Sequence, residues 1–352
     1  MRAVRFYQYG GPEVLQLEEV PIPEPGEGEV LLRVYATSVR RSDLSQRAGR
    51  ENYFRATLPF QLGRESSGVV SGVGPGVEGW KEGDEAITTN ITPCGSCDNC
   101  RLNWPEMCRR PRYQGVSSWG GYADYVALPA GSLMRKPPEL AHDQAAGFQG
   151  GLLTAWHNLV GRGRLRAGET LLVPSASGAV ASAGVIVGAY AGARVIAATS
   201  SPDKAGRIAA LGADAVIDTS STDLGQRLSD LTAGRGADLL FDTVGGDEFH
   251  RRAALVCSGG RIVMPGSSAG NELRFPISAL IQNQVDLLFS KGSRPDEAAL
   301  VLSLLAAGKL RVPIGQIFPL ERTGDAHRCL ENRSQVGRVV LDVAGAGFQP
   351  NI

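Results

Sequence analysis

The chain has 352 residues, and its 36 basic and 36 acidic residues leave no formal net charge. This balance argues against a nucleic-acid partner, and no apolar run approaches the roughly 18 residues that a membrane span requires. The first residues lack the apolar core of a signal peptide, so we expect a cytoplasmic protein with neither nucleic-acid nor membrane partners. The length predicts about two domains, and 43% hydrophobic residues with 45 glycines and 20 prolines are typical of a turn-rich globular protein.

The first 150 residues predict a compact, mainly antiparallel β domain. Segments 14–20, 29–35 and 68–73 are short and rich in β-branched residues, and Pro/Gly-rich turns such as Pro21–Gly26 separate them. Short strands divided in this way are typical of antiparallel sheets. We therefore place a first domain at residues 1–150.

Four of the six cysteines lie close together in the pattern C-x2-C-x2-C-x7-C: Cys94, Cys97, Cys100 and Cys108. Four thiolates with this spacing can close a tetrahedron around zinc and leave no position open for chemistry. Four free exposed thiols, the alternative, would be reactive. The spacing therefore predicts one structural zinc ion per chain, in a lobe of about residues 94–108.

From about residue 151 the pattern changes to strands that alternate with helices. The strand candidates are Leu171–Val173, Ala193–Thr199, Ala215–Asp218, Asp238–Val244, Arg261–Pro265 and Asp286–Ser290. Strict alternation predicts an α/β domain at residues 151–291, with a doubly wound parallel sheet covered by helices on both faces. A helix-like segment at 295–307 and β-like stretches ending at 339–341 make up the remainder, residues 292–352.

The turn between the first two of these strands is a candidate dinucleotide site. Ser177, Gly178 and Ala179 are small residues that stand where strand 171–173 passes to a helix at 180–191. Free backbone N–H groups and the positive end of a helix dipole can hold a pyrophosphate there. Because only one glycine occupies this turn, a plain βα turn without a ligand is the alternative.

The end of the second strand indicates which dinucleotide is preferred. An NAD site favours an acid there, to bind the ribose 2′-hydroxyl. This chain instead has the run Thr199–Lys204, in which Ser200 and Lys204 suit a 2′-phosphate. The sequence therefore predicts NADP(H).

Taken together, these patterns resemble the medium-chain dehydrogenases/reductases, specifically the zinc-type alcohol dehydrogenases and quinone oxidoreductases. The residues that carry the resemblance follow the family order: Tyr9–Leu15, Asp43, Gly63, Glu65, Gly68–Val70, Gly83–Asp84, Thr154–Trp156, Gly212–Asp214, Asp242–Gly246 and Gly337–Leu341. The resemblance implies a GroES-like β domain, a Rossmann domain, and a C-terminal return to the first domain. It also implies a homodimer and further cofactor contacts from Thr154, Val180, Val244, Gly266, Ser267 and Arg338.

The resemblance also implies where a catalytic zinc would be held, and the three ligand positions here are Arg40, Arg64 and Gly150. An arginine stays protonated and has no lone pair to give to a cation. We therefore expect no catalytic zinc.

Asp43 and Glu65 match acids that the family keeps near the metal. Without a cation their burial would be costly, so Arg40 and Arg64 are expected to supply the missing positive charge. In a second, compatible role, one arginine also faces the substrate and binds a carboxylate or an enolate-like oxygen. The other catalytic candidates are Ser42, at the position that relays a proton in alcohol dehydrogenases, and Tyr53.

The hypothesis from the sequence is a zinc-independent, NADPH-dependent oxidoreductase that reduces an activated C=C bond or a quinone. Its substrate would be a small molecule, anionic or an α,β-unsaturated carbonyl compound. Carbonyl reduction normally relies on the metal that the sequence lacks. The alternative is a family member in a non-redox role, either a cofactor-independent biosynthetic catalyst or a binding protein.

Overall fold

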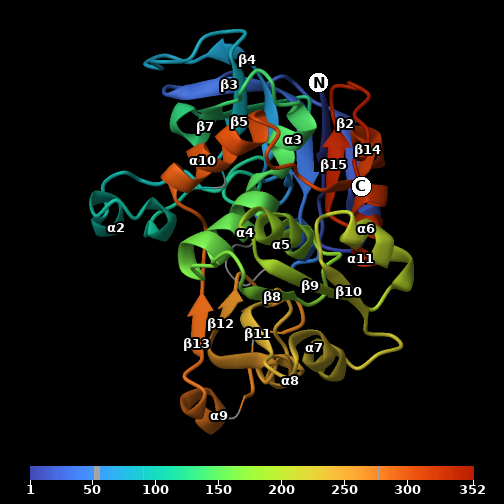
Figure 1. Cartoon of the computed structure of the whole chain (residues 1–352). Coiled ribbons are helices and arrows are strands. Elements are labelled where there is room, and N and C mark those ends of the chain that lie inside the picture. The colour runs from blue at the N-terminus through green and yellow to red at the C-terminus, as the bar shows by residue number, and fades with distance from the viewer. Residues whose placement is uncertain (51–55, 90, 271, 276) are drawn as a thin grey trace. The chain divides into compact units, whose positions relative to one another are not determined.

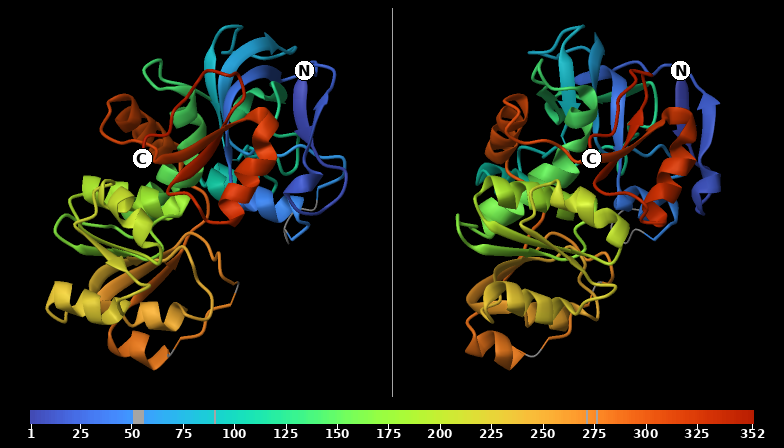
Figure 2. Two further views of the ribbon diagram at one scale, coloured as in Figure 1. Left: turned by 90° about the vertical axis from the view of Figure 1, so that its right-hand side faces the viewer. Right: turned by 45° about the vertical axis from the view of Figure 1, so that its right-hand side comes forward.

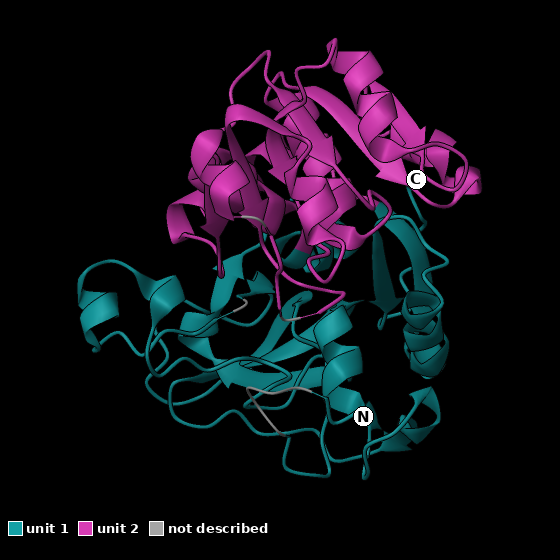
Figure 3. Ribbon diagram, turned by 90° about the horizontal axis from the view of Figure 1, so that it is seen from below, with its two compact units in different colours: residues 1–150, 314–351 teal, residues 151–313, 352 magenta. Residues whose placement is uncertain are grey.

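The computed structural model describes residues 1–50, 56–89, 91–270, 272–275 and 277–352. The chain forms two compact units, one of residues 1–150 with 314–351 and the other of residues 151–313 with 352 (Figure 3). None of the helices formed by the described residues is both long and apolar enough to cross a bilayer.

Unit 1 is built on a seven-stranded sheet and a separate two-stranded one (Figure 1). The large sheet has the strand order β14-β15-β3-β4-β5-β7, and β6 also pairs with β3. Its strands are β3 (Glu29–Val39), β4 (Ser66–Val73), β5 (Glu85–Thr88), β6 (Tyr125–Pro129), β7 (Leu133–Arg135), β14 (Ile314–Pro319) and β15 (Arg338–Asp342). The small sheet pairs β1 (Arg2–Arg5) with β2 (Gln16–Glu19). All pairings are antiparallel except β14 with β15, as the sequence analysis expected of this domain.

Short helices surround this sheet. They are α1 (Arg41–Arg47), α2 (Asp98–Arg101), α3 (His142–Gly147) and α11 (Thr323–Glu331), with the 3-10 turns η1 (Pro12–Val14), η2 (Pro105–Met107), η3 (Ala130–Ser132) and η7 (Leu320–Arg322). One hydrophobic core joins residues distant in sequence, including Phe6, Leu32, Tyr122 and Leu341. The C-terminal strands are therefore integral to this unit.

Unit 2 contains a six-stranded parallel sheet with the strand order β10-β9-β8-β11-β12-β13. The strands are β8 (Thr170–Val173), β9 (Arg194–Thr199), β10 (Ala215–Asp218), β11 (Ala237–Phe241), β12 (Val256–Met264) and β13 (Asp286–Phe289). The order reverses between β8 and β11, and at such a switch point the carboxyl ends of parallel strands form a ligand crevice. The doubly wound Rossmann sheet predicted from the sequence is confirmed.

Helices lie on both faces of this sheet (Figure 2). They are α4 (Thr154–Trp156), α5 (Ala179–Tyr190), α6 (Ala205–Ala209), α7 (Leu224–Thr232), α8 (Phe249–Ala253), α9 (Ile277–Gln282) and α10 (Pro295–Ala306), with η6 (Pro202–Lys204) and the π-helical segments η4 (Gln149–Leu153) and η5 (His157–Arg162). A core that includes Leu172, Ile196, Leu240 and Ile262 lies between the sheet and these helices.

The helix after β8 packs unusually close to the sheet because it contains glycines. A Cβ on Gly184 would lie 2.6 Å from Cδ1 of Phe241 in β11, and a Cβ on Gly188 would lie 3.0 Å from Cγ2 of Val195 in β9. Close packing of the helix on the strands is the role of the third glycine in the dinucleotide fingerprint. Gly184 and Gly188 therefore allow this close packing, although they lie beyond the fingerprint positions.

The second domain ends later than the sequence analysis placed it. Residues 292–313 were expected to belong to the C-terminal return, but they form part of unit 2, and the return begins at Ile314. The reason is that α10 is fastened within unit 2, where Oε2 of Glu297 lies 2.7 Å from Nδ1 of His157. Its apolar face, including Val301 and Leu305, is buried.

Candidate functional site

Arg40 and Arg64 meet at one edge of the unit 1 sheet. Arg40 directly follows β3 and Arg64 shortly precedes β4, the strand that pairs antiparallel with β3. Gly63 makes the approach to β4 possible, because its φ is +104° and a Cβ on it would lie 2.7 Å from the backbone N of Gly121. The sheet register therefore brings both arginines together.

Each arginine pairs with the acid beside the other. Nη1 of Arg40 lies 3.0 Å from Oε1 of Glu65, and Nε of Arg64 lies 3.6 Å from Oδ1 of Asp43. The two carboxylates are buried, with side chains 1% and 0% exposed, whereas Arg40 and Arg64 are 26% and 18% exposed. Arg64 and Glu65, neighbours in the sequence, therefore bind different partners and not each other.

Helix α1 holds Arg64 through two side chains one turn apart. Nη2 of Arg64 donates to Oε1 of Gln46 at 3.2 Å, next to the contact with Asp43. Asp43 is fixed in turn by the backbone N–H of Arg40, the N-cap residue of α1, which donates to Oδ2 at 2.9 Å. The hydroxyl of Ser42 is buried and has no hydrogen-bond partner among the described residues.

Glu65 has a second and more deeply buried cationic partner. Arg338, whose side chain is 2% exposed, pairs with Oε2 of Glu65 and also donates to Oγ of Ser38. Burial alone would raise the pKa of Glu65, but the charges of Arg338 and Arg40 outweigh burial and lower that pKa. Asp43 differs, because burial raises its pKa more than Arg64 and the Arg40 N–H lower it.

Gly150, the third predicted metal-ligand position, lies against the ion pair of Arg40 and Glu65. A Cβ on Gly150 would overlap Oε1 of Glu65 and come within 3.1 Å of Cζ of Arg40. Any larger side chain at this position would therefore displace the pair. Gly150 and Arg40 therefore lie together, whereas Tyr53, the remaining catalytic candidate, lies outside the described residues.

The candidate cofactor turn lies at the carboxyl end of β8 in unit 2. Gly178 is the N-cap of α5, and the half-buried Ser177, Ala179 and Val180 flank it. A Cβ on Gly178 would have no neighbour closer than 3.8 Å, so this turn leaves room for a ligand. The helix of 12 residues directs its first N–H groups toward this end.

Two further cofactor candidates follow β9. Ser200 is exposed directly after the last residue of the strand. Lys204 ends the turn η6, and only 6% of it is exposed.

The other cofactor candidates lie in different places. Val244 is half-buried beyond β11, and Gly266 and Ser267 are exposed beyond β12, at the same sheet edge as Gly178. Thr154 begins α4. Arg338 is the residue that neutralises Glu65 in unit 1.

The four cysteines of the lobe converge. Their sulfur atoms all lie within 4.8 Å of one another, and Sγ of Cys97 is 3.4 Å from that of Cys100 and 3.9 Å from that of Cys108. Zn–S bonds of about 2.3 Å in a tetrahedron place sulfur atoms about 3.8 Å apart. The residues present therefore fit a zinc ion closely.

Backbone donors around the lobe prepare these sulfur atoms to bind a cation. The N–H groups of Arg109 and Arg110 point at Sγ of Cys97 and Cys108, at 3.5 and 3.4 Å. The N–H of Ser96 is the largest cause of a lowered pKa of Cys94, about 5. Such donors favour the thiolate form that zinc requires.

Comparison with known proteins identifies the family. Two family models match, the alcohol dehydrogenase GroES-like domain at residues 26–138 and the zinc-binding dehydrogenase at residues 211–341. An NAD-dependent alcohol dehydrogenase of Sulfurisphaera tokodaii is 30% identical over 349 residues, 97% of this chain and 99% of that protein. The chain belongs to the medium-chain dehydrogenase/reductase superfamily.

Two further members of the superfamily are informative. The crystal structure of an NAD-dependent alcohol dehydrogenase superimposes with a TM-score of 0.92 at 37% identity, covering 98% of this chain and 100% of that one. An acryloyl-coenzyme A reductase of S. tokodaii is 26% identical over 333 residues, 94% of this chain and 97% of that protein. This chain is an oxidoreductase of the medium-chain dehydrogenase/reductase type, and the family resemblance read from the sequence is confirmed.

Replacing Cys97 by serine is expected to reduce the zinc content of this superfamily member and to loosen the lobe. The exposed Leu102, Trp104 and Met107 contribute little core there, so a bound zinc ion would supply most of the local stability. The melting temperature should fall by on the order of 5 °C or more, with faster proteolysis near residues 94–112. The control, Cys329→Ser, changes a half-buried cysteine outside the lobe. Equal melting temperatures for both variants would argue against a structural metal.

Some residues of this site were missed by sequence reasoning. Tyr122 donates to Oδ2 of Asp43 at 3.2 Å and also contacts His327, which is fully buried. In the sequence, only the two glycines that precede Tyr122 in the run Gly120–Asp124 could have indicated that this residue belongs to a functional site. Nothing in the helix that carries His327 indicated a role for that residue.

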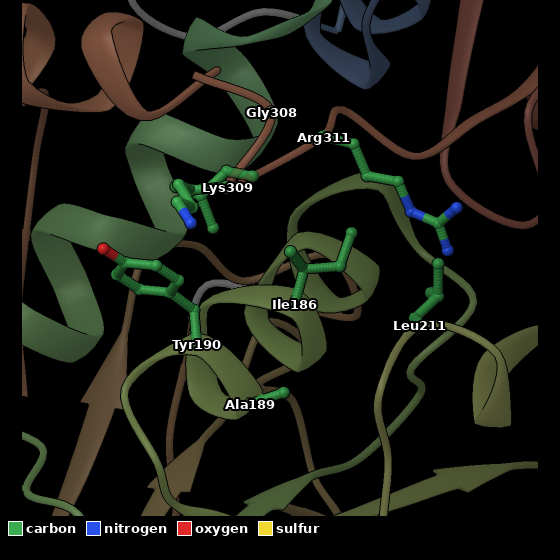
Figure 4. Close-up of a pocket in the computed structure, with 8 residues that line it drawn as sticks. Ile186, Ala189, Tyr190, Leu211, Gly308, Lys309 and Arg311 are labelled. Atoms are coloured by element: carbon green, nitrogen blue, oxygen red, sulfur yellow. The ribbon is translucent and has the colours of Figure 1, made fainter. Parts of the chain in front are cut away.

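A hollow of about 270 Å³ lies elsewhere in unit 2, beside the end of α5 (Figure 4). Ile186 and Tyr190 line one side, and Lys309 and Arg311 line another. The guanidinium of Arg311 donates to the carbonyl oxygen of Ala210. None of the cofactor candidates lines this hollow, and we assign it no role.

Proposed function

We propose that this chain is an NADPH-dependent reductase of activated C=C bonds or quinones that works without a catalytic zinc. One observation carries the proposal: two partly exposed arginines are each held against a buried carboxylate, at positions where the family resemblance implies catalytic metal ligands. Guanidinium groups cannot bind a metal cation, but they can stabilise an oxyanion.

The side chains at the three predicted metal-ligand positions argue against a second zinc ion. Arg40, Arg64 and Gly150 offer no lone pair to a metal from their side chains. Among the described residues, the cysteine lobe is the one group of three or more potential ligand side chains close enough together to hold a metal. Zinc independence of the chemistry follows from this proposal.

The reaction that suits an arginine site is conjugate reduction. When bound, the reduced nicotinamide supplies a hydride to the electrophilic carbon. The π electrons of the double bond move onto the conjugated oxygen, where Arg64 or Arg40 stabilises the negative charge. A proton from solvent then completes the product at the neighbouring carbon, because the buried Ser42 hydroxyl has no hydrogen-bond partner among the described residues from which it could regain a proton. The guanidinium thus replaces the Lewis acid that a carbonyl reductase obtains from zinc.

The names of the relatives support both carbonyl and C=C chemistry in this superfamily. The S. tokodaii relatives include an alcohol dehydrogenase and an acryloyl-coenzyme A reductase. We favour C=C reduction here because the two arginines suit an enolate better than an alkoxide bound to a metal.

The choice of NADPH rests on the end of β9. Ser200 occupies the position at which an acid would bind the ribose 2′-hydroxyl of NAD, and Lys204 follows four residues later. The matched alcohol dehydrogenases are named as NAD-dependent, so this preference is specific to the proposal and needs its own test.

Introducing an acid at Ser200 is expected to reverse the preference. Ser200→Asp should repel a 2′-phosphate, and Lys204→Ala should weaken NADPH binding by about 1.5–3 kcal/mol, while NADH binding changes little in the latter variant. Fluorescence titration of both nucleotides measures this. Lys291→Ala, which removes an exposed lysine elsewhere in unit 2, is the control. An unchanged preference in both test variants would contradict the NADP assignment.

We also propose a homodimer formed through the edge of the unit 2 sheet. Strand β13 ends the sheet, and exposed apolar side chains lie on it and on the preceding helix: Phe289 (57%), Ile277 (64%) and Ile281 (69%). An uncovered apolar edge strand is an aggregation hazard, so a second copy is the natural cover.

Sedimentation at micromolar concentration should give the mass of a dimer. Phe289→Asp should shift the protein toward a monomer, because it places a charge in the paired edges. Leu300→Asp is the control, since Leu300 is an exposed apolar residue on α10. A wild-type monomer would contradict the assembly.

The function itself is tested by following nicotinamide absorbance. NADPH oxidation should be detected with at least one class among enones, quinones and 2-alkenoic acids, and simple aldehydes and ketones should react more slowly. If NADPH binds but only carbonyl compounds react, the C=C assignment fails. If no nicotinamide nucleotide binds, the hydride source is lost and a non-redox role takes its place.

A further inference from the structure

A continuous chain of buried polar side chains runs from Asp43 to the surface of unit 1. The hydroxyl of Tyr122 lies 3.2 Å from Oδ2 of Asp43 and 3.2 Å from Nε2 of His327. Nδ1 of His327 lies 3.0 Å from Nη1 of Arg47, and Nη2 of Arg47 bonds to Glu331, whose side chain is 32% exposed. The three linking side chains are at most 1% exposed.

Elements far apart in the sequence contribute the side chains of this hydrogen-bond chain. Asp43 and Arg47 lie one turn apart on α1, Tyr122 precedes β6, and His327 and Glu331 lie one turn apart on α11. The ring of Tyr122 meets that of His327 edge-on, at 5.8 Å and 80°. Such a buried network has a cost unless every member is satisfied.

Arg47 fixes the direction of every hydrogen bond in the chain. A guanidinium only donates, so Nδ1 of His327 must accept from Arg47. Burial, followed by the charge of Arg47, lowers the pKa of His327 to about 3, so its ring is neutral and carries its single proton on Nε2. Nε2 then donates to the Tyr122 oxygen, and the hydroxyl is left to donate to Asp43.

The outcome at Asp43 is a defined orientation. Oδ2 accepts from both the Tyr122 hydroxyl and the backbone N–H of Arg40. Oδ1 is thereby turned toward Nε of Arg64, 3.6 Å away. The chain resembles a proton path, but Arg47 cannot release a proton, and its role is to hold donors in place.

We infer that Arg47, His327 and Tyr122 are positioning residues that orient Asp43 through a one-way chain of donors, and through Asp43 hold the Arg64 guanidinium for an anionic substrate. This inference rests on the proposed function for its last step. The charged groups facing Asp43 are Arg64, Arg40, Glu65 and, through Tyr122, Arg338 and Arg47.

The tautomer of His327 tests the direction of the chain without any substrate. The full-length protein labelled with nitrogen-15 at histidine should give four imidazole spectra, and His327→Gln assigns the one of interest. We expect the neutral Nε2–H tautomer, unchanged between roughly pH 5 and pH 9. An Nδ1–H tautomer, or an ordinary titration in this range, would overturn the inference.

Tyr122→Phe tests the effect on Asp43. Loss of a donor to the carboxylate disfavours its ionised form, so the Asp43 carboxyl should titrate at higher pH than in the wild type. Infrared difference spectra, assigned with Asp43→Asn, report this in the ligand-free protein. Tyr35→Phe is the control, because it removes the hydroxyl of a half-buried tyrosine that stacks on His142 and takes no part in the hydrogen-bond chain. Identical Asp43 titration in Tyr122→Phe and the control would overturn the inference.

Kinetics of Tyr122→Phe separate positioning from simple support of the fold. For an anionic 2-alkenoate, KM should rise on the order of tenfold with kcat within about twofold, and the acid limb of the kcat/KM profile should move to higher pH. If KM and the pH profile of kcat/KM are unchanged in Tyr122→Phe, the hydrogen-bond chain has only a structural role. If the wild type turns over no substrate, the proposed function fails, while the two spectroscopic measurements still decide the direction of the chain.

Discussion

Arg64→Leu is expected to lower kcat/KM for anionic or enolate-forming substrates by a factor of about 10²–10³, the usual effect of removing one donor that stabilises an oxyanion. Nε of Arg64 lies 3.6 Å from Oδ1 of Asp43, beyond hydrogen-bond distance, and the Arg64 side chain is 18% exposed, so this ion pair contributes less to stability than a close, fully buried pair. Asp43 keeps the donors from Arg40 and Tyr122. The loss of folding stability should therefore stay near 1–3 kcal/mol.

Urea denaturation and steady-state kinetics on the same preparations measure both effects. Arg41→Leu is the matched control, because Arg41 is an exposed arginine on the same helix. If Arg64 only neutralises Asp43, stability will fall more and the double variant Asp43→Asn with Arg64→Leu will recover both stability and activity. Normal stability with undiminished activity would exclude both roles.

Arg338→Leu is expected to have the largest effect on stability, a loss of about 3–5 kcal/mol of unfolding free energy. The side chains of Arg338 and Glu65 are 2% and 1% exposed, so the variant leaves a buried carboxylate with only Arg40, itself partly exposed, as a cationic partner. Arg40→Leu should cost less, because Arg338 remains in place.

The double variant Arg338→Leu with Glu65→Leu should recover much of this loss, because no unpaired charge stays buried. Urea titration of the single and double variants gives the coupling free energy directly. A coupling near zero would mean that Glu65 is already compensated without Arg338. The cofactor contact that the family resemblance implies for Arg338 remains a separate prediction, for which nucleotide affinity is the readout.

Local patterns in the sequence were sufficient for most of the fold. The alternation of apolar runs and helices predicted the parallel sheet of unit 2, because its central strands β8 and β11 are buried on both faces and read as continuous apolar segments. The spacing of Cys94, Cys97, Cys100 and Cys108 predicted a cluster because a tetrahedral metal imposes short distances. The pairing of Arg40 and Arg64 with Asp43 and Glu65 could be predicted because burying an unpaired charge is costly.

The remainder depended on contacts between distant parts of the chain. Glu65 and Arg338 are 273 residues apart, and Arg47 and His327 are 280 apart, so no local pattern could indicate either contact. The boundary near residue 292 was wrong because a helix such as α10 has the same sequence period whichever unit it packs on. The interior Gly184 of α5 carried no signal until Phe241 was found against it.

The zinc-to-chain ratio and the rate of NADPH oxidation, measured on one sample with a reactive enone or 2-alkenoic acid, test the central claim most directly. The arginine site predicts about one zinc per chain, held by the four cysteines, and a turnover rate that added zinc does not raise. Two zinc ions per chain, or a rate that rises with a second equivalent of zinc, would contradict the claim that Arg40 and Arg64 replace the catalytic metal.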